Sequence, residues 1–446
     1  MGIIKSNDIR GIYPDELNDE TAWRIGFYLK EILGCDRILV GRDGRGSSEP
    51  LFRALTEGIS ASGAEAVSIG RCDTPAVYFA TVKYGFEGSV MITASHNPAE
   101  YNGFKVSRKN AVPVGRENGL ERLGELISIA PDCASVSTDI KGKISFLDIT
   151  ADYTAHVCKF AKIKRKMKIV VDCGSGAAGF YVKKIFSSLS GDFIYIFDTP
   201  ESDFSLHNPN PLKKSVHDAV SEAVGKVNAD FGVCFDGDAD RAVFFDENGN
   251  FISPDIITAF FASYYAGSED GWKAFYDVRS SNCVKEFIEK NGGTAVSCRT
   301  GHSHIKKIMK ESNALFAGEL SGHYYFRDNF FCDSGFIAFL VMLSAVSGQD
   351  KSLSTLLADI NTYSFSGEIN FKVENIDRVI SRIEENYKSG KKDTTEGLRI
   401  DFNDWWFIVR SSTAEPVLRL VVEADSGENM KKHVNELSAM IKGCVI

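Results

Sequence analysis

A hydroxyl side chain, Ser95, lies in a polar segment that directly follows a strand-like apolar run. The run spans residues 88–93 and leads into the sequence Thr-Ala-Ser-His-Asn-Pro at 93–98. Pro98 has a fixed φ and disfavours helix at Asn97, which predicts a rigid loop after the strand. A serine presented in this way can act as a nucleophile or carry a phosphoryl group.

His96 follows Ser95 and raises the alternative of a serine hydrolase. Neighbouring residues in extended backbone point to opposite sides, so we expect His96 to be poorly placed as a base for Ser95. The G-x-S-x-G elbow of many hydrolases does not surround Ser95. A hydroxyl that holds phosphate is the better interpretation, because an acidic segment further along the chain could supply a metal ion.

Three carboxylates alternate in the acidic segment Phe-Asp-Gly-Asp-Ala-Asp-Arg at 235–241: Asp236, Asp238 and Asp240. The small residues between them allow the backbone to fold closely around an ion. Hard oxygen ligands suit Mg²⁺ or Ca²⁺. Carboxylates crowded after a buried strand repel one another unless a cation is present. The segment therefore predicts a metal site, with a solvated acidic turn as the alternative.

An EF-hand calcium loop is a second alternative for the same segment, because Glu247 falls at loop position twelve. Position six is Arg241, where that loop needs glycine. Apolar runs at 230–235 and 242–245 also predict strands on both sides, where an EF-hand has helices. We therefore expect that the loop is not an EF-hand.

Further polar residues follow other apolar runs and could bind a phosphorylated sugar. Glu319 and Ser321 are two residues apart and share one side of an extended segment, so they could grip adjacent hydroxyls. Arg410 offers a bidentate fork for phosphate oxygens, and hydroxyls follow it. The remaining candidates are Ser411, Ser412, Thr413, Lys105, Thr300, Gly301 and His302.

A full G-x-G-x-x-G pattern lies at Gly174–Gly179, after a strand-like run that ends at Asp172. Asp198 ends the next apolar run, as in dinucleotide-binding units. One interpretation is an oxidoreductase that binds NAD through this loop. The interpretation we favour is that the glycines allow close packing between a strand and a helix.

The elements that must position these residues are strands alternating with helices. Apolar runs at 37–41, 168–172, 230–235, 314–318 and 405–409 each precede a polar loop, and helix-like stretches such as 20–33 and 50–62 lie between runs. This order predicts α/β domains with mostly parallel sheets, whose ligands bind at the carboxyl ends of strands. We expect domains at 1–147, 148–247, 248–361 and 362–446.

Composition excludes several classes of protein. Of the 446 residues, 43% are hydrophobic and 25% charged, which is ordinary for a globular protein. No apolar run approaches the ~20 residues of a membrane helix, so we expect no membrane partner. A net charge of -9 argues against nucleic acid as a partner. The ten cysteines are scattered, which predicts buried thiols in a reducing cytoplasm.

Taken together, the motifs resemble the α-D-phosphohexomutase family, and in particular its bacterial phosphomannomutase/phosphoglucomutase branch. The similarity covers nearly the whole chain in the family's order. Its motifs are Asp8-Ile-Arg-Gly11, the serine loop with Asn102-Gly-Phe-Lys105, the three-aspartate loop, Gly318-Glu-Leu-Ser-Gly-His323 and Arg410-Ser-Ser-Thr-Ala-Glu-Pro416. The resemblance implies three related α/β domains with mixed or parallel sheets, and a smaller C-terminal α+β domain, around a central cleft.

The resemblance also implies a role for each site residue. Ser95 would carry the phosphate, and Mg²⁺ would be held by Ser95, Asp236, Asp238 and Asp240. Arg241 would contact the phosphate, Lys105 and His323 would be the acid and base, and hexose 1,6-bisphosphate would be intermediate and activator. The other candidates for the catalytic site are His96 and Arg10; for the phosphosugar they are Glu319, Ser321, Thr300, Gly301, His302, Arg279, Arg410, Ser411, Ser412 and Thr413.

Three departures from the family pattern concern specificity. Ala414 stands where a threonine is usual, Arg279 where a lysine is common, and Asn7 where an aromatic residue is frequent. Mannose and glucose phosphates are the expected substrates, with phosphoglucosamine mutase as the alternative. A metal-binding protein without mutase activity is a further alternative, and a monomer or dimer is expected.

Overall fold

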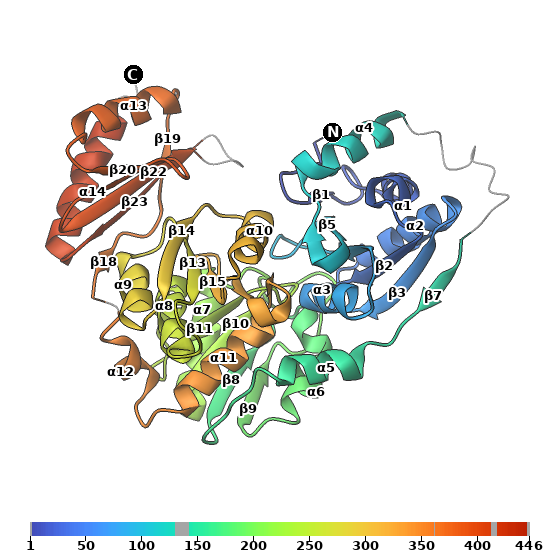
Figure 1. The fold of residues 1–446 in the computed structure, drawn as a ribbon, viewed down its shortest axis with the longest axis horizontal. Coiled ribbons are helices and arrows are strands. Elements are labelled where there is room, and N and C mark those ends of the chain that lie inside the picture. Colours follow the sequence, from blue (N-terminus) through green and yellow to red (C-terminus); the bar gives the residue numbers. More distant parts are fainter. Residues whose placement is uncertain (1, 130–141, 361, 412–416, 444–446) are drawn as a thin grey trace.

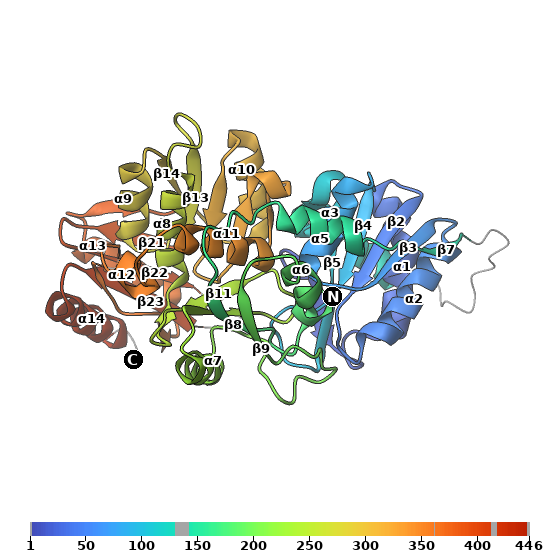
Figure 2. The same ribbon diagram turned by 90° about the horizontal axis from the view of Figure 1, so that it is seen from below.

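The computed structural model of the protein describes residues 2–129, 142–360, 362–411 and 417–443. These residues form four sheets that follow one another along the chain, each with its own helices (Figure 1). The N-terminal sheet lies at one end of the molecule and the C-terminal sheet at the other, with the two remaining sheets between them (Figure 2). The predicted α/β fold class is confirmed.

The N-terminal sheet has the strand order β1-β5-β4-β2-β3-β7, and β6 (Val112–Pro113) pairs with β5. Strands β4, β2, β3 and β7 are parallel; β5 is antiparallel to β4, and the edge strand β1 is antiparallel to β5. The strands are β1 (Ile9–Ile12), β2 (Arg37–Arg42), β3 (Glu65–Arg71), β4 (Gly88–Ile92), β5 (Tyr101–Arg108) and β7 (Ile144–Phe146). The helices are α1 (Asp19–Leu33), α2 (Ser48–Ala61), α3 (Thr74–Lys83) and α4 (Leu120–Ile129).

The second sheet has the order β12-β11-β10-β8-β9, in which β10, β8 and β9 are parallel, β11 is antiparallel to β10, and β12 is antiparallel to β11. Its strands are β8 (Lys168–Asp172), β9 (Asp192–Ile196), β10 (Phe231–Phe235), β11 (Ala242–Phe245) and β12 (Phe251–Ile252). Its helices are α5 (Thr150–Cys158), α6 (Val182–Phe186) and α7 (Lys214–Val227). Strand β11 occupies the position where an EF-hand has a helix.

The third sheet repeats the second, with the order β14-β13-β15-β16-β17 and the same pattern of directions. Its strands are β13 (Lys273–Asp277), β14 (Thr294–Cys298), β15 (Phe316–Gly318), β16 (Tyr324–Phe326) and β17 (Cys332–Asp333). Its helices are α8 (Pro254–Tyr265), α9 (Asn282–Lys290), α10 (His302–Ser312), α11 (Gly335–Ser347) and α12 (Leu353–Leu357). Strands β2 to β5 have this order too, so the first three domains share one plan.

The fourth sheet is antiparallel throughout its described strands, in the order β18-β23-β22-β21-β20, and β19 also pairs with β23. Its strands are β18 (Ser364–Phe365), β19 (Ile369–Lys372), β20 (Lys391–Asp393), β21 (Leu398–Asp401), β22 (Trp405–Ser411) and β23 (Val417–Ala424). Its helices are α13 (Ile376–Asn386) and α14 (Gly427–Lys442).

One hydrophobic core joins the first three domains, whereas the fourth has a core of its own. Helix α11 is apolar on almost every face and contributes residues such as Phe336 and Phe339 to the shared core. Phe339 stacks on Phe186 of the second domain at a centroid distance of 4.7 Å. The shared core holds the loops of three domains in fixed positions. Within the described residues, no helix is long and apolar enough to cross a membrane.

Candidate active site

Ser95 lies in the loop after β4, as predicted, and its side chain is buried among polar groups. Its Oγ donates to Asp236 Oδ2 at 3.1 Å, and its backbone N–H donates to Thr93 Oγ1 at 2.9 Å. The φ angle of Ser95 is 52°, a left-handed conformation that a serine adopts only where its surroundings hold it. The serine loop is thus fixed before any substrate arrives.

Arg45, which the sequence did not single out, is the group that holds this loop. Its guanidinium donates to four carbonyls, those of Ser95 at 2.7 Å, Asn97 at 2.8 Å, Pro98 at 2.7 Å and Tyr101 at 3.2 Å. Its Nε donates to Asp43 at 3.1 Å, and both side chains of this pair are buried. The charge of Asp43 balances that of Arg45, which leaves the planar fork free to bind the loop backbone.

The three-aspartate loop follows β10 and packs directly against the serine loop. A Cβ on Gly237 would lie 2.4 Å from the carbonyl oxygen of Ser95, so only glycine permits this approach. Thr74, at the start of α3, donates to Asp238 Oδ2 at 2.5 Å. The loop is thereby held from the first domain on two sides.

Lys105 on β5 lies between two of the aspartates, and its Nζ is 2.6 Å from both Asp238 Oδ2 and Asp240 Oδ2. Burial disfavours the lysine charge, but these two carboxylates outweigh it and raise the pKa of Lys105 above its usual value. Burial likewise opposes the charge of Asp240, yet Lys105, His323 and Arg241 hold its pKa well below the ordinary range. Burial and the neighbouring carboxylates of Asp240 and Asp238 raise the pKa of Asp236.

The residues present fit a hard divalent cation. The carboxylates of Asp236, Asp238 and Asp240 have one oxygen each within 4.8 Å of one another. Among the described residues, Asp238 Oδ1 is buried without a hydrogen-bond partner. Burial, and then the charges of Asp240 and Asp238, raise the pKa of Asp236, and a cation at this place would favour the ionised form. These oxygens suit Mg²⁺, with Ser95 Oγ 3.1 Å from one of them.

Arg241 and His323 join the aspartate loop to the third domain. Their backbones form a bridge, and Arg241 Nε lies 3.3 Å from His323 Nε2. Arg241 Nε is also 3.5 Å from Asp236 Oδ2, and His323 Nε2 is 3.3 Å from Asp240 Oδ1. A guanidinium and an imidazole therefore lie beside the predicted metal ligands.

The expectation that His96 points away from Ser95 is wrong. Ser95 Oγ lies 3.4 Å from His96 Nδ1, because the backbone at Ser95 is left-handed where the prediction assumed an extended strand. Arg241, burial and Arg10 lower the pKa of His96, which keeps the ring neutral. Arg10 itself donates to Asn97 Oδ1 at 2.7 Å and so braces the serine loop from β1.

Glu319 and Ser321 follow β15 on the third domain, and both are already engaged. Glu319 accepts hydrogen bonds from Tyr325 Oη at 2.6 Å and from the Gly301 N–H at 3.0 Å. Ser321 Oγ lies 2.8 Å from His323 Nδ1. The conformation of the segment 319–323 is therefore tied to Gly301, the residue before α10. His302 begins that helix, and burial, Lys306 and Lys105 lower the pKa of its ring.

Arg410 lies inside β22 where a position after the strand was expected, since the strand runs on to Ser411. Its guanidinium is paired with Glu368 Oε2 at 2.7 Å and lies 3.5 Å from Glu396 Oε1. Glu396 also accepts from the N–H and the hydroxyl of Thr300, at 2.6 and 2.9 Å. Glu396 therefore connects the fourth domain to the third, whereas Glu368 pairs with Arg410 within the fourth domain, and the sequence predicted neither carboxylate.

The other predicted residues of this group are less informative. Arg279 pairs with Asp277, with Nε 2.8 Å from Oδ1, which places it at the end of β13 near the backbone of Leu320. Ser411 is exposed at the end of β22. Ser412 and Thr413, together with Ala414, lie outside the described residues.

The glycine loop at Gly174–Gly179 packs against the three-aspartate loop at 235–241. A Cβ on Gly176 would lie 2.7 Å from the Gly237 carbonyl oxygen, and the Ala177 N–H donates to that oxygen at 2.9 Å. The backbone of Gly237 thus fills the space next to Gly176 that a pyrophosphate would need. This packing supports the structural interpretation of the glycines.

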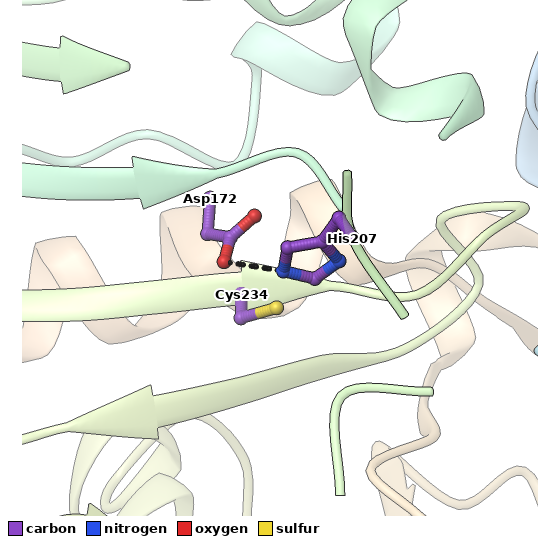
Figure 3. A group of neighbouring side chains, drawn as sticks. All are labelled: Asp172, His207 and Cys234. Atoms are coloured by element: carbon purple, nitrogen blue, oxygen red, sulfur yellow. Dashed lines mark hydrogen bonds and ion pairs between the residues drawn. The ribbon is translucent and has the colours of Figure 1, made fainter. Parts of the chain in front are cut away.

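A buried cluster of Asp172, His207 and Cys234 lies behind this loop (Figure 3). His207 Nε2 is 2.9 Å from Asp172 Oδ2, which anchors the segment that continues to Pro209. The Pro209 carbonyl accepts from the Gly237 N–H at 3.1 Å. Burial, and then the charge of Asp172, raises the pKa of the Cys234 thiol. The cluster consists of an Asp–His pair and a neutral thiol, and it holds the three-aspartate loop in place.

Comparison with known proteins identifies this arrangement. Four segments match the four phosphoglucomutase/phosphomannomutase domains: residues 1–127 match domain I, 151–249 domain II, 253–363 domain III and 368–440 the C-terminal domain. The chain is 37% identical over 445 residues to "Phosphohexose mutases" of Xanthomonas campestris pv. campestris strain B100, covering 98% of this chain and 99% of that protein. The chain belongs to the phosphoglucomutase/phosphomannomutase family.

Other members of the family agree in sequence and in fold. A phosphomannomutase of Escherichia coli strain K12 is 37% identical over 430 residues, 94% of each chain. The crystal structure of a family protein from Burkholderia thailandensis superposes with a TM-score of 0.90 at 28% identity, covering 99% of this chain and 97% of that one. The predicted family is confirmed, and the protein is an intramolecular phosphotransferase that acts on hexose phosphates. The family depends on Mg²⁺ and uses a hexose bisphosphate as activator.

Proposed function

We propose that the protein interconverts hexose 1-phosphates and hexose 6-phosphates through a phosphate carried on Ser95. The observation that supports this most directly is the buried Ser95 hydroxyl, 3.1 Å from Asp236 in a loop that Arg45 holds by four carbonyls. A nucleophile held by its own loop and placed beside a metal site can accept and return a phosphoryl group without a second enzyme.

The reaction has two transfers. In the first, a hydroxyl oxygen of the hexose phosphate attacks the phosphorus on Ser95, the bond from phosphorus to Oγ breaks, and a hexose 1,6-bisphosphate forms. In the second, the bisphosphate has turned around, Ser95 Oγ attacks its other phosphorus, the bond from that phosphorus to the sugar oxygen breaks, and the isomeric hexose monophosphate leaves while Ser95 is phosphorylated again. Arg241 stabilises the charge on the transferring group, while Lys105 and His323 donate and accept the proton. Mg²⁺ held by the three aspartates would neutralise charge on the same group.

The third and fourth domains bind the sugar phosphate. Glu319 and Ser321 bind the sugar hydroxyls, with Gly301, Thr300 and His302 beside them. Arg410 and the hydroxyls that follow it bind the phosphate that does not react, with Arg279 nearby. A phosphate on Arg410 must compete with Glu368, which is bonded to Arg410 at 2.7 Å.

Mannose and glucose phosphates are the proposed substrates, because Leu320 and Phe104 lie where the mannose/glucose branch has these residue types. Glucosamine phosphate is the second candidate. Rates on the 1-phosphates of mannose, glucose and glucosamine, with glucose 1,6-bisphosphate as activator, distinguish the two. A glucosamine rate above both others would overturn the assignment of substrate while leaving the mutase reaction intact.

Replacement of the nucleophile tests the reaction itself. The Ser95→Ala variant should fold but show no turnover above background, because the phosphate carrier is gone. Thr93→Ala is the matched control. It removes the Thr93 hydroxyl that accepts from the Ser95 N–H but keeps the Ser95 hydroxyl, so turnover should fall without vanishing. Turnover like that of the wild type in Ser95→Ala would remove Ser95 from this role.

Three further proposals concern the whole chain. The domains divide at 147, 247 and 361, supported by one sheet on each side of these positions. The protein works in the cytoplasm, supported by the eight described cysteines, all of them unpaired. It is a monomer or a dimer, and it has no nucleic-acid partner because its net charge is -9.

A further inference from the structure

A cavity lined by none of the candidate site residues opens where the first three domains meet. Its volume is about 580 Å³. The walls come from the C-terminal half of α3, from α5 and the segment after it, from the end of α8 and from the turn at 327–331. All of these elements pack on the shared core, so the cavity is part of the fixed frame and not a gap between moving domains.

Aromatic rings line much of this cavity. The rings of His156 and Phe330 are nearly parallel, with centroids 5.3 Å apart and an interplanar angle of 8°. Phe79 lies 4.9 Å from His156, and Tyr264 and Tyr265 form the wall on α8. Burial lowers the pKa of His156, which keeps its ring neutral near pH 7. Flat, uncharged rings of this kind stack favourably on a flat aromatic ligand.

The turn that presents Phe330 is strained. Phe330 and Phe331 have φ angles of 59° and 63°, which are outliers for bulky residues. The side chain of Asn329 fixes the turn, because its Oδ1 lies 2.9 Å from His156 Nε2 and its Nδ2 donates to the Cys332 carbonyl at 3.2 Å. Strain of this kind persists where the surroundings impose it, and it concentrates at binding sites.

Three lysines lie around the aromatic rings. Lys83, Lys159 and Lys162 line the cavity, and none of them forms an ion pair within the described part of the chain. Both carboxylates of the lining are engaged: Asp152 accepts from Tyr84 Oη at 2.7 Å, and Asp328 lies 3.7 Å from Arg327 Nε. Lys162 Nζ also lies over the Tyr264 ring, 5.4 Å from its centroid. The three lysines outnumber the two carboxylates of the lining, and this local excess of positive charge favours an anion.

We propose that this cavity binds a nucleotide, with the base packed against Phe330 and the α8 tyrosines and the phosphate held by the lysines. The volume lies within the range of about 300–1,000 Å³ that is typical of small-molecule sites. A nucleotide combines the two features that the lining calls for, a flat heterocycle and a negative phosphate. The inference does not depend on the proposed roles of Ser95 or of the metal loop.

Titration calorimetry with AMP tests the proposal on the full chain. The titration contains Mg²⁺ and saturating glucose 1,6-bisphosphate, so that the phosphate contacts of the active site are occupied. AMP should bind saturably at one site, and adenosine, which keeps the base but lacks the phosphate, should bind at least about tenfold more weakly. No saturable AMP binding up to millimolar concentration, or equal binding of adenosine, would overturn the proposal.

Two pairs of variants locate the binding site. Ala155 is exposed on α5 and lines the cavity, so Ala155→Trp should fill it and abolish AMP binding; Ala151→Trp, on the same helix but outside the lining, should not. Reversal of Lys159 and Lys162 to Glu should weaken AMP binding about tenfold, because two attractions become repulsions. Lys164→Glu is the control outside the lining. Equal effects within either pair would place the nucleotide elsewhere and contradict the proposal.

Discussion

Replacement of Arg45 by lysine is the sharpest test of how the fold prepares the nucleophile. The guanidinium donates to the carbonyls of Ser95, Asn97, Pro98 and Tyr101 and pairs with Asp43, and its side chain is fully buried. Lysine keeps the charge opposite Asp43, but a single ammonium cannot span carbonyls from four residues. Losing two charge-assisted bonds at about 1.5 kcal/mol each lowers the free energy of unfolding by about 3 kcal/mol. The variant should still fold, since domains are typically stable by about 5–15 kcal/mol.

The effect of Arg45→Lys on catalysis should exceed its effect on substrate binding. A serine loop that relaxes by about 1 Å loses roughly a hundredfold in rate, because the Ser95 Oγ leaves its line of attack. The expected result is a kcat lowered about a hundredfold with KM nearly unchanged, since sugar and distal phosphate bind to other domains. Urea denaturation gives the stability loss in parallel. Arg53→Lys, the same change at an exposed position on α2, is the control. A stability loss of the expected size with kcat within threefold of wild type would refute the reasoning.

Two further predictions concern the metal and the phosphate grip. EDTA should abolish turnover and lower thermal stability. Mg²⁺ at a hundred times its Kd should restore about 2.7 kcal/mol to the free energy of unfolding, measured by calorimetry. A melting temperature that Mg²⁺ does not change would argue against a metal site at the three aspartates. Glu368→Gln removes the carboxylate that competes with phosphate for Arg410. It should lower KM up to about fivefold, the factor that corresponds to the free energy of an exposed ion pair. Glu374→Gln, the control, should leave KM unchanged. An unchanged KM in Glu368→Gln would show that Glu368 does not compete with phosphate.

The placement of Ser95 and of the three aspartates could be predicted from the sequence because each follows a strand. Strands β4 and β10 are parallel members of their sheets, and polar loops at the carboxyl ends of such strands gather ligands. The same argument predicts Glu319, after β15, beside these loops, and its Oε2 lies 3.5 Å from His323 Nδ1. The local pattern of an apolar run followed by a polar loop is enough to predict these positions, because the geometry of a parallel sheet places the carboxyl ends of its strands at one edge.

The residues that the sequence did not reveal act through the backbone or across domains. Arg45 binds carbonyl oxygens fifty or more residues away, and no side-chain pattern marks such a partner. The left-handed backbone at Ser95 is equally hidden, because it is imposed by these contacts on a residue that does not prefer it. Glu368 becomes visible as the partner of Arg410 only once the fourth domain is folded, and Glu396 as the partner of Thr300 only once that domain lies against the third.

The measurement that tests the central claim most directly is the location of the phosphate after reaction. The protein is incubated with Mg²⁺ and glucose 1,6-bisphosphate, digested, and its peptides are mapped by mass spectrometry, with Ser95→Ala treated alongside. A phosphopeptide that carries its single phosphoryl group on Ser95, and that is absent from the variant, is the predicted result. A bare Ser95 with the phosphate on another residue, in a protein that turns over, would contradict it.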